Sequence, residues 1–289
     1  MKKTLIVNGD SWVFGSEIVD PELAKRYPAN VHVGNYDHLE ENDFYRLPRI
    51  FPTKLAERMA ADVVNLSWPA DDNQSICNRT IEYITKNYIN TGKGVDDLFV
   101  VVGWSSPERV RFWYKDDERS QKFIIWPSLE WFDTPAQEKF WRLYVAYLWN
   151  KEEFIPRYVE TVLRFQNFCV EHGIKYLMFN AFYQGQGSGC SHDIGSDFDV
   201  KTELEQLASD GYDYSLNGIR YHGVMYSAKH LWETVDPIRY YNKDQQKNSF
   251  RTFITDRLTN PLSGWHPSEE GHAIWAAELH DYILRNNLQ

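Results

Sequence analysis

Four short apolar runs constrain the fold of this chain more than any other feature. Each is rich in β-branched or aromatic residues and is apolar at successive positions, which is the pattern of a strand covered on both faces. Strands of that kind occur in parallel sheets with helices on either side. The runs, which we predict to be strands of one mainly parallel sheet, are Thr4–Asn8, Asp62–Leu66, Leu98–Gly103 and Ile174–Asn180.

Segments of helical periodicity alternate with these runs. In each segment the apolar residues recur at a spacing of three or four, so they lie on one face of a helix. Gly173 stands where a C-terminal helix cap belongs, and Ser268 caps the last segment. The alternation predicts a three-layer α/β domain. The predicted faces are Cys77, Ile81, Ile84 and Tyr88; Tyr158, Val162, Phe165 and Cys169; and Trp275, Leu279 and Tyr282.

The length of 289 residues suits one large α/β domain, and we expect residues 1–289 to form a single one. Two regions depart from the alternation of strands and helices. Residues 108–149 are crowded with aromatic side chains, and residues 184–256 are polar and irregular. Both are interpreted as insertions that decorate the domain.

Charge and cysteine content exclude several classes of protein. Asp and Glu number 41 against 31 for Lys and Arg, a net charge of −10, which argues against nucleic acid or an anionic membrane as a partner. The three cysteines, Cys77, Cys169 and Cys190, form no C-x-x-C pair, as is typical of a reducing compartment. The sequence has no apolar run long enough for a membrane span and no signal-peptide pattern. We therefore expect a cytoplasmic protein.

The first candidate for chemistry is Ser11, in Gly9-Asp10-Ser11 directly after the first predicted strand. Ligands bind at the carboxyl ends of parallel strands, and the backbone N–H groups that open the next helix stabilise an oxyanion there. The motif is not a G-x-S-x-G elbow, because Val13 replaces the second glycine. A plain helix N-cap is the alternative.

The second candidate is His266, in Trp265-His266-Pro267-Ser268 just before the last helical segment. A serine nucleophile needs a base, and a histidine that titrates near neutral pH is the usual one. A structural histidine is the alternative. His272 follows six residues later without a metal-site spacing, so we expect it to pack near the site and predict no metal.

Together these blocks resemble the SGNH (GDSL) hydrolase family, of which this chain looks like a divergent member. The resemblance implies a flavodoxin-like three-layer α/β/α fold and an activity as an esterase, lipase or carbohydrate deacetylase, without a cofactor. Carried over, Ser11 is the nucleophile and His266 the general base. The backbone N–H of Ser11 would contribute to the oxyanion hole.

Three positions differ from the family pattern. Ala70 stands where the family has a glycine whose N–H binds the oxyanion, and Ser105 stands where an asparagine side chain does so. Ser263 replaces the aspartate that orients the histidine in D-x-x-H-P. Ser263, a backbone carbonyl, Asp256 or another loop carboxylate remain as candidates for that task.

We therefore expect a serine esterase or deacylase that hydrolyses a small O-acyl ester, with a small-molecule or carbohydrate ester as substrate. A catalytically degenerate fold that serves as a binding or structural module is the alternative, because three family positions have changed. Transfer of the acyl group to an acceptor other than water would use the same residues.

Arg109, after the third strand, either pairs on the surface or holds a substrate carboxylate or phosphate. The glycine-rich loop before Cys190 is expected to line the entrance to the site.

Overall fold

The parallel sheet predicted from the apolar runs forms the centre of the protein. The computed structural model describes residues 3–28, 31, 33–116, 119–125, 134–149, 151–181, 212–216, 219–223, 228–243 and 249–289. The sheet has the order β2-β1-β3-β6, and all of its neighbouring strands are parallel. Its strands are β1 (Thr4–Asn8), β2 (Asp62–Asn65), β3 (Leu98–Trp104) and β6 (Lys175–Asn180), so all four predicted strands are confirmed.

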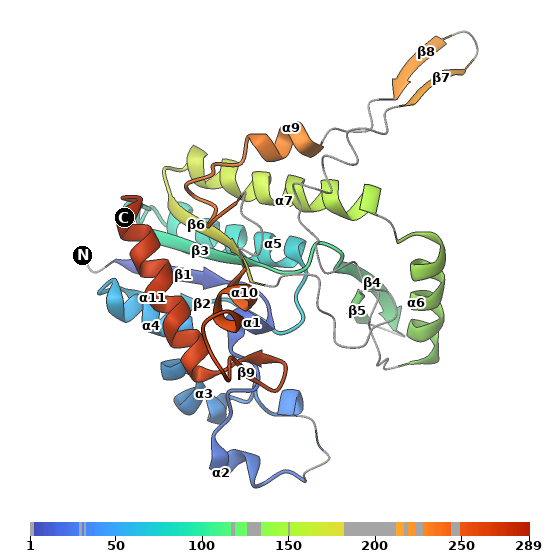
Figure 1. Ribbon diagram of the computed structural model, residues 1–289. Coiled ribbons are helices and arrows are strands. Elements are labelled where there is room, and N and C mark those ends of the chain that lie inside the picture. Colours follow the sequence, from blue (N-terminus) through green and yellow to red (C-terminus); the bar gives the residue numbers. More distant parts are fainter. Residues whose placement is uncertain are drawn as a thin grey trace.

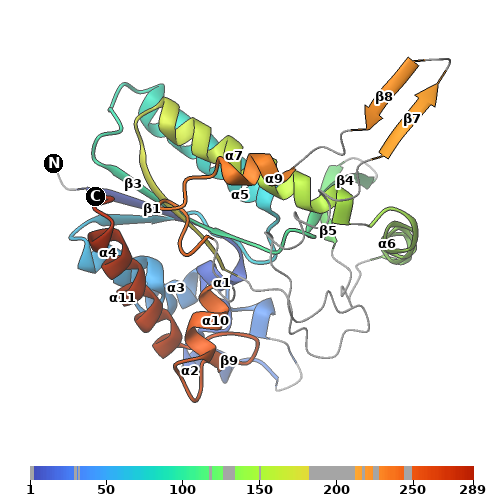
Figure 2. The same ribbon diagram turned by 45° about the horizontal axis from the view of Figure 1, so that its top comes forward.

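Helices cover both faces of this sheet (Figures 1 and 2). One face carries α4 (Phe51–Arg58), α10 (Phe250–Thr255) and α11 (Glu269–Arg285). The other carries α5 (Asn73–Ile84), α7 (Lys151–Glu171) and α9 (Ala228–Glu233). The predicted three-layer α/β class is therefore confirmed.

Alternate residues of β1, β3 and β6 pack into two separate cores, whereas Asp62 and Val63 of the edge strand β2 are exposed. In β1, Leu5 and Val7 face α4 and α11, whereas Ile6 faces α5 and α7. All three are fully buried, which explains why the strand is apolar at successive positions. The predicted helix faces are confirmed in the same way, since Cys77 in α5 and Phe165 in α7 are fully buried in the second core.

Short elements lie between β1 and α4, beyond the carboxyl end of β1 (Figure 1). Between α5 and β3 the chain makes a π-helical turn, η3 (Thr85–Ile89). The short elements are α1 (Ser11–Phe14), α2 (Pro21–Ala24), η1 (Val33–Asn35), α3 (Glu40–Arg46) and η2 (Leu47–Arg49).

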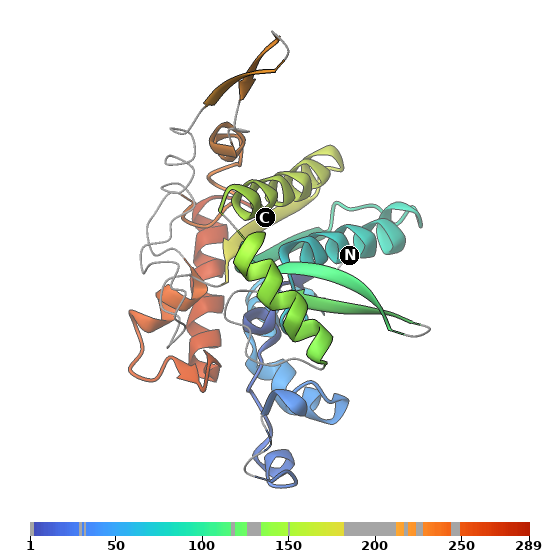
Figure 3. The same ribbon diagram turned by 90° about the vertical axis from the view of Figure 1, so that its right-hand side faces the viewer.

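The aromatic region 108–149 makes a small unit of its own. Its strands β4 (Val110–Asp116) and β5 (Arg119–Ile125) pair antiparallel, and α6 (Pro135–Tyr147) lies across them (Figure 3). The Phe112 ring packs edge-on against Phe140 and Tyr144, with centroids 4.9 and 5.4 Å apart. The aromatic residues of this region therefore supply its local packing.

The region 184–256 differs from the prediction at its C-terminal end. Tyr240 bridges to Met178 at the free edge of β6, and Tyr240, Phe250 and Ile254 are fully buried. This stretch therefore belongs to the domain core and is not an insertion. The polar residues interspersed along it obscure the periodicity of its apolar positions.

Earlier in the region, β7 (Tyr212–Leu216) and β8 (Ile219–Gly223) form an antiparallel pair. Cys190 and its glycine-rich loop lie outside the described residues.

Within the part of the chain that the structure describes, no helix is both long and apolar enough to cross a membrane.

Candidate active site

Ser11 is the first residue of α1, three residues beyond the carboxyl end of β1. The Asp10 carboxylate caps the helix by accepting the Trp12 N–H at 3.0 Å. Ser11 is largely buried, with 8% of its surface exposed. Among the described residues, no acceptor takes its backbone N–H. The strand-to-helix turn therefore presents a hydroxyl and an unclaimed N–H together.

Ala70 lies in the loop that joins β2 to α5 and has a left-handed backbone, with φ of 58°. That conformation favours glycine, which is the residue that the resemblance places here. Alanine tolerates it at some cost and keeps its N–H. No hydrogen bond within the described ranges uses this N–H. The backbone turn expected of the glycine thus forms with alanine in its place.

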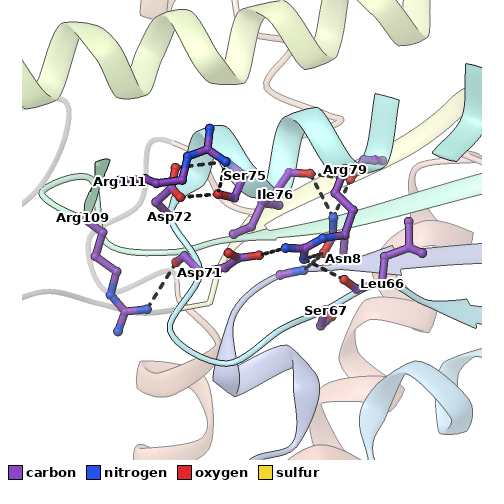
Figure 4. Close-up of polar contacts among 12 residues, drawn as sticks. Asn8, Leu66, Ser67, Asp71, Asp72, Ser75, Ile76, Arg79, Arg109 and Arg111 are labelled. Atoms are coloured by element: carbon purple, nitrogen blue, oxygen red, sulfur yellow. Dashed lines mark hydrogen bonds and ion pairs between the residues drawn. The ribbon is translucent and has the colours of Figure 1, made fainter. Parts of the chain in front are cut away.

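A buried polar network holds this loop beneath α5 (Figure 4). The Arg79 guanidinium pairs with the fully buried Asp71 carboxylate and donates to the Leu66 carbonyl at 2.9 Å. The Asn8 amide donates to the Ile76 carbonyl at 2.9 Å, which links the end of β1 to α5. Arg79 of α5 therefore holds the loop at both ends, through Leu66 and Asp71.

Ser105, just after β3, directs its hydroxyl to Asp10. The hydroxyl donates to Asp10 Oδ2 at 2.7 Å, and the Ser105 N–H donates to Asn73 Oδ1 at 2.8 Å. To donate to an oxyanion, the hydroxyl would have to rotate away from Asp10. Arg109 Nη1 lies 3.3 Å from the same Asp10 oxygen, and its side chain is 10% exposed. Arg109 is thus part of the buried polar surroundings of Asp10.

His266 lies in a small hairpin formed by β9 (Leu262–Ser263) and β10 (His266–Pro267), immediately before α11. Its ring lies beside that of Trp12, the residue after Ser11, with centroids 6.3 Å apart. No hydrogen bond joins His266 to Ser11 in the described part of the chain. The fold thus brings the two predicted residues to the same region from opposite ends of the sequence.

The imidazole faces a loop carboxylate, Glu17, which the sequence did not single out by number. Glu17 Oε1 lies 3.3 Å from His266 Nδ1, and the Glu17 side chain is only 6% exposed. Its other oxygen, Oε2, accepts the backbone N–H groups of Trp265 at 2.7 Å and His266 at 3.2 Å. Burial alone would raise the pKa of Glu17, but the contact with His266 and the two N–H donors outweigh it and lower the pKa.

The two orienting candidates named from the sequence lie elsewhere. Ser263 is opposite His266 in the hairpin but is exposed, and no hydrogen bond from it to the imidazole is present among the described residues. Asp256 is exposed at the end of α10. No motif marks Glu17, because its contact with His266 depends on the turn that follows α1.

His272 packs in the core, as the sequence argument expected. It is fully buried in α11, and its Nδ1 accepts the Phe51 N–H at 3.2 Å. Burial lowers its pKa to about 3, and the charges of His266, Lys54 and Arg46 act in the same direction. His272 is therefore neutral near pH 7. Histidine, cysteine and acidic side chains do not gather into a possible metal-binding group of three or more within the described ranges.

A family model describes this chain. The family of unknown function DUF6071 matches residues 36–214, which is well over half of the sequence. The chain belongs to the DUF6071 family. No curated protein matches this DUF6071 chain.

Several solved structures are similar to this DUF6071 protein over nearly its whole length. One, from Desulfitobacterium hafniense DCB-2, is described as a lipolytic protein of the G-D-S-L family; it is 12% identical, with 97% of this chain and 99% of that chain covered and a TM-score of 0.42. A second is a carbohydrate esterase family 2 enzyme from Myceliophthora fergusii, which is 10% identical. The match covers 99% of this chain and 67% of that chain, with a TM-score of 0.45. A third, from Slackia heliotrinireducens, is described as an SGNH hydrolase; it is 12% identical, with 98% and 100% covered and a TM-score of 0.38.

A three-layer α/β domain carries Ser11 directly after its first strand and His266 directly before its last helix. This is the order that the sequence blocks predict.

Proposed function

We propose that this DUF6071 protein is a serine esterase or deacylase that hydrolyses a small O-acyl ester. One observation carries the proposal. At the carboxyl edge of the parallel sheet, α1 presents the Ser11 hydroxyl and N–H, and the His266 ring lies beside that of Trp12. The loop that carries Ala70 is held at this edge by the Trp68 N–H, which donates to the Gly9 carbonyl at 3.1 Å. Within the described residues, no acceptor takes the N–H groups of Ser11 and Ala70. These are a nucleophile, two oxyanion donors and a base.

The reaction follows from those groups. Ser11 Oγ attacks the ester carbonyl carbon while His266 Nε2 takes its proton, and the N–H groups of Ser11 and Ala70 bind the resulting oxyanion. Collapse of this intermediate releases the alcohol, which takes the proton from His266. Water then loses a proton to His266 and attacks the acyl-enzyme carbonyl. As this second intermediate collapses, Ser11 Oγ leaves and takes the proton back from His266, which releases the carboxylic acid and restores both residues. The chemistry requires no metal or cofactor.

An active-site-directed probe tests this proposal directly. We expect a fluorophosphonate to add once to the parent protein, at Ser11, with no adduct in Ser11→Ala and a rate at least about 100-fold lower in His266→Ala. Intact mass and peptide mapping measure both. A folded parent that takes no label under conditions that label a known serine hydrolase would contradict the proposal and favour the binding-module alternative.

Two exposed tryptophans support a ring-shaped alcohol as the leaving group. Trp265 directly precedes His266 and is 62% exposed, and Trp68, two residues before Ala70, is 51% exposed. The backbone N–H groups of both residues are held by site residues, Trp265 by Glu17 and Trp68 by the Gly9 carbonyl. Exposed indole faces stack on flat apolar surfaces such as those of sugar rings. We infer that a carbohydrate ester is the substrate class.

Matched substrates test this inference. Trp68→Ala and Trp265→Ala should lower kcat/KM for an acetylated oligosaccharide by about 10-fold or more, yet change it little for 4-nitrophenyl acetate, which lacks a sugar. Tyr147→Ala, at an exposed position of α6, is the control. Equal losses on both esters in the tryptophan variants would contradict a role in sugar binding.

A further inference from the structure

We propose that Glu17, in the turn after α1, is the residue that positions the His266 ring. The SGNH resemblance assigns this task to an aspartate three residues before the histidine. The inference rests on the proposed function for its catalytic meaning. Ser263 occupies that family position here and carries no charge. The carboxylate would then come from a different element of the fold.

The first argument is the placement of the two carboxylate oxygens. Oε1 lies 3.3 Å from His266 Nδ1, while Oε2 accepts the N–H groups of Trp265 and His266 itself. Both oxygens therefore contact the hairpin that carries the imidazole. The contact lies within ion-pair distance but does not have the geometry of a hydrogen bond. A carboxylate this close to Nδ1 favours the proton on that nitrogen, which leaves Nε2 unprotonated and able to act as a base.

The second argument is that the backbone on both sides is shaped for this contact. Glu17 has a left-handed φ of 69°, and its N–H donates to the buried Asp37 carboxylate at 3.0 Å. Across the contact, Gly264 has φ of 66°, and a Cβ there would lie 2.4 Å from Glu17 Oε2. A left-handed conformation is uncommon for residues other than glycine, and it persists where surrounding contacts determine it.

A merely structural role for Glu17, as an anchor of the hairpin, predicts a different result. The charged and titratable groups around it are His266, which it contacts, and Asp37, which binds its N–H and lies 3.6 Å from His38 Nδ1. An anchor needs only an acceptor for the two backbone N–H groups. A positioning residue must in addition present an acceptor, and not a donor, to His266 Nδ1.

Glu17→Gln separates the two roles. The N–H groups of Trp265 and His266 require an oxygen at the Oε2 position, so the amide should turn its NH₂ toward His266 Nδ1. That NH₂ donates to Nδ1 and moves the imidazole proton to Nε2. We expect ¹⁵N NMR at alkaline pH to show the Nδ1–H tautomer in the parent and the Nε2–H tautomer in Glu17→Gln, at a similar melting temperature.

Labelling by the fluorophosphonate should fall about 10²–10⁴-fold in Glu17→Gln, as expected for a base in the wrong tautomer. Glu22→Gln, at an exposed carboxylate of α2, is the matched control and should label like the parent. An Nε2–H tautomer in the parent, or an unchanged tautomer in Glu17→Gln, would overturn the role of Glu17. The NMR readout needs no turnover. A parent with the Nδ1–H tautomer that takes no label would therefore contradict the proposed esterase while it supports the positioning of His266.

Discussion

Single residues in this protein carry backbone conformations that their side chains do not favour. Ala70, with φ of 58°, bears on the proposed chemistry because its N–H is one of the two expected oxyanion donors. The left-handed region costs a residue other than glycine about 1–2 kcal/mol. Glycine avoids this cost but loses about 0.5–1 kcal/mol more in conformational entropy on folding.

These two terms oppose each other, so Ala70→Gly should raise the free energy of unfolding by between zero and about 1.5 kcal/mol. It should also retain fluorophosphonate labelling, since it keeps the N–H. Ala70→Val places a β-branched side chain at positive φ and should lower both stability and labelling rate. Urea unfolding and intact mass measure the effects. Loss of labelling in a stable Ala70→Gly variant would exclude the backbone N–H as the important feature of this position.

His272 makes stability depend on pH. Its pKa is about 3 in the folded protein because it is buried, against about 6.5 for an unfolded histidine. Between these values the unfolded chain binds the proton and the folded chain does not. Stability contributed by neutral His272 is thus complete above about pH 6.5 and is lost as pH falls toward 3, by about 1.4 kcal/mol per unit at most.

His272→Asn should remove this slope. Asparagine Oδ1 can accept the Phe51 N–H that Nδ1 accepts, although loss of the ring stacked on Phe51 lowers stability at pH 7. Urea unfolding between pH 4 and pH 7 compares the two proteins. If the free energy of unfolding depends on pH in the same way in the parent and in His272→Asn, groups other than His272 cause the acid sensitivity.

At the scale of elements, the β9–β10 hairpin is expected to set the position of His266. Gly264 forms its turn with φ of 66°, and a Cβ there would lie 2.4 Å from Glu17 Oε2. Gly264→Ala should therefore separate the hairpin from Glu17 and slow labelling about 10-fold or more. Gly92→Ala is the matched control, because Gly92 has φ of 68° with no atom within 4 Å of its Cβ position.

The two glycine variants introduce similar backbone strain. A comparison of their melting temperatures and labelling rates therefore isolates the effect of the contact between Gly264 and Glu17. We expect similar losses of stability and a loss of labelling in Gly264→Ala alone. Equal labelling rates in the two variants would contradict the expected dependence on the hairpin.

The sequence predicts some elements of this site better than others, for physical reasons. Strands and helix faces follow from local periodicity, which is why β1 and the caps Ser268 and Gly173 match the prediction. Ser11 and His266 stand out because they lie next to such elements. Glu17 does not, because its contact with His266 depends on a left-handed turn and on a hairpin some 250 positions away, and neither leaves a periodic pattern.

At the scale of the whole molecule, the sheet divides the protein into two cores with different relations to the site. One core includes Trp12, Phe250 and Trp275 between the sheet and α4, α10 and α11. The other includes Phe165 between the sheet and α5 and α7. The polar composition around Phe250 predicts an insertion. The segment nevertheless belongs to the core, because a tertiary contact and not a local sequence pattern buries it.

The first core includes Trp12, the residue after Ser11, whose ring lies 6.3 Å from that of His266. The Phe250 ring packs against Trp12 at 5.8 Å and His272 at 5.5 Å, whereas Phe165 contacts Trp104 and Tyr176, both at 5.8 Å. Both phenylalanines are fully buried, so Phe250→Leu and Phe165→Leu should each cost roughly 1–3 kcal/mol of stability. Under conditions where both variants remain folded, fluorophosphonate labelling should slow in Phe250→Leu alone. The cavity that this substitution leaves loosens Trp12, which follows Ser11 and whose ring lies beside that of His266. Equal slowing in Phe165→Leu would mean that the site responds to global stability and not to the core beneath it.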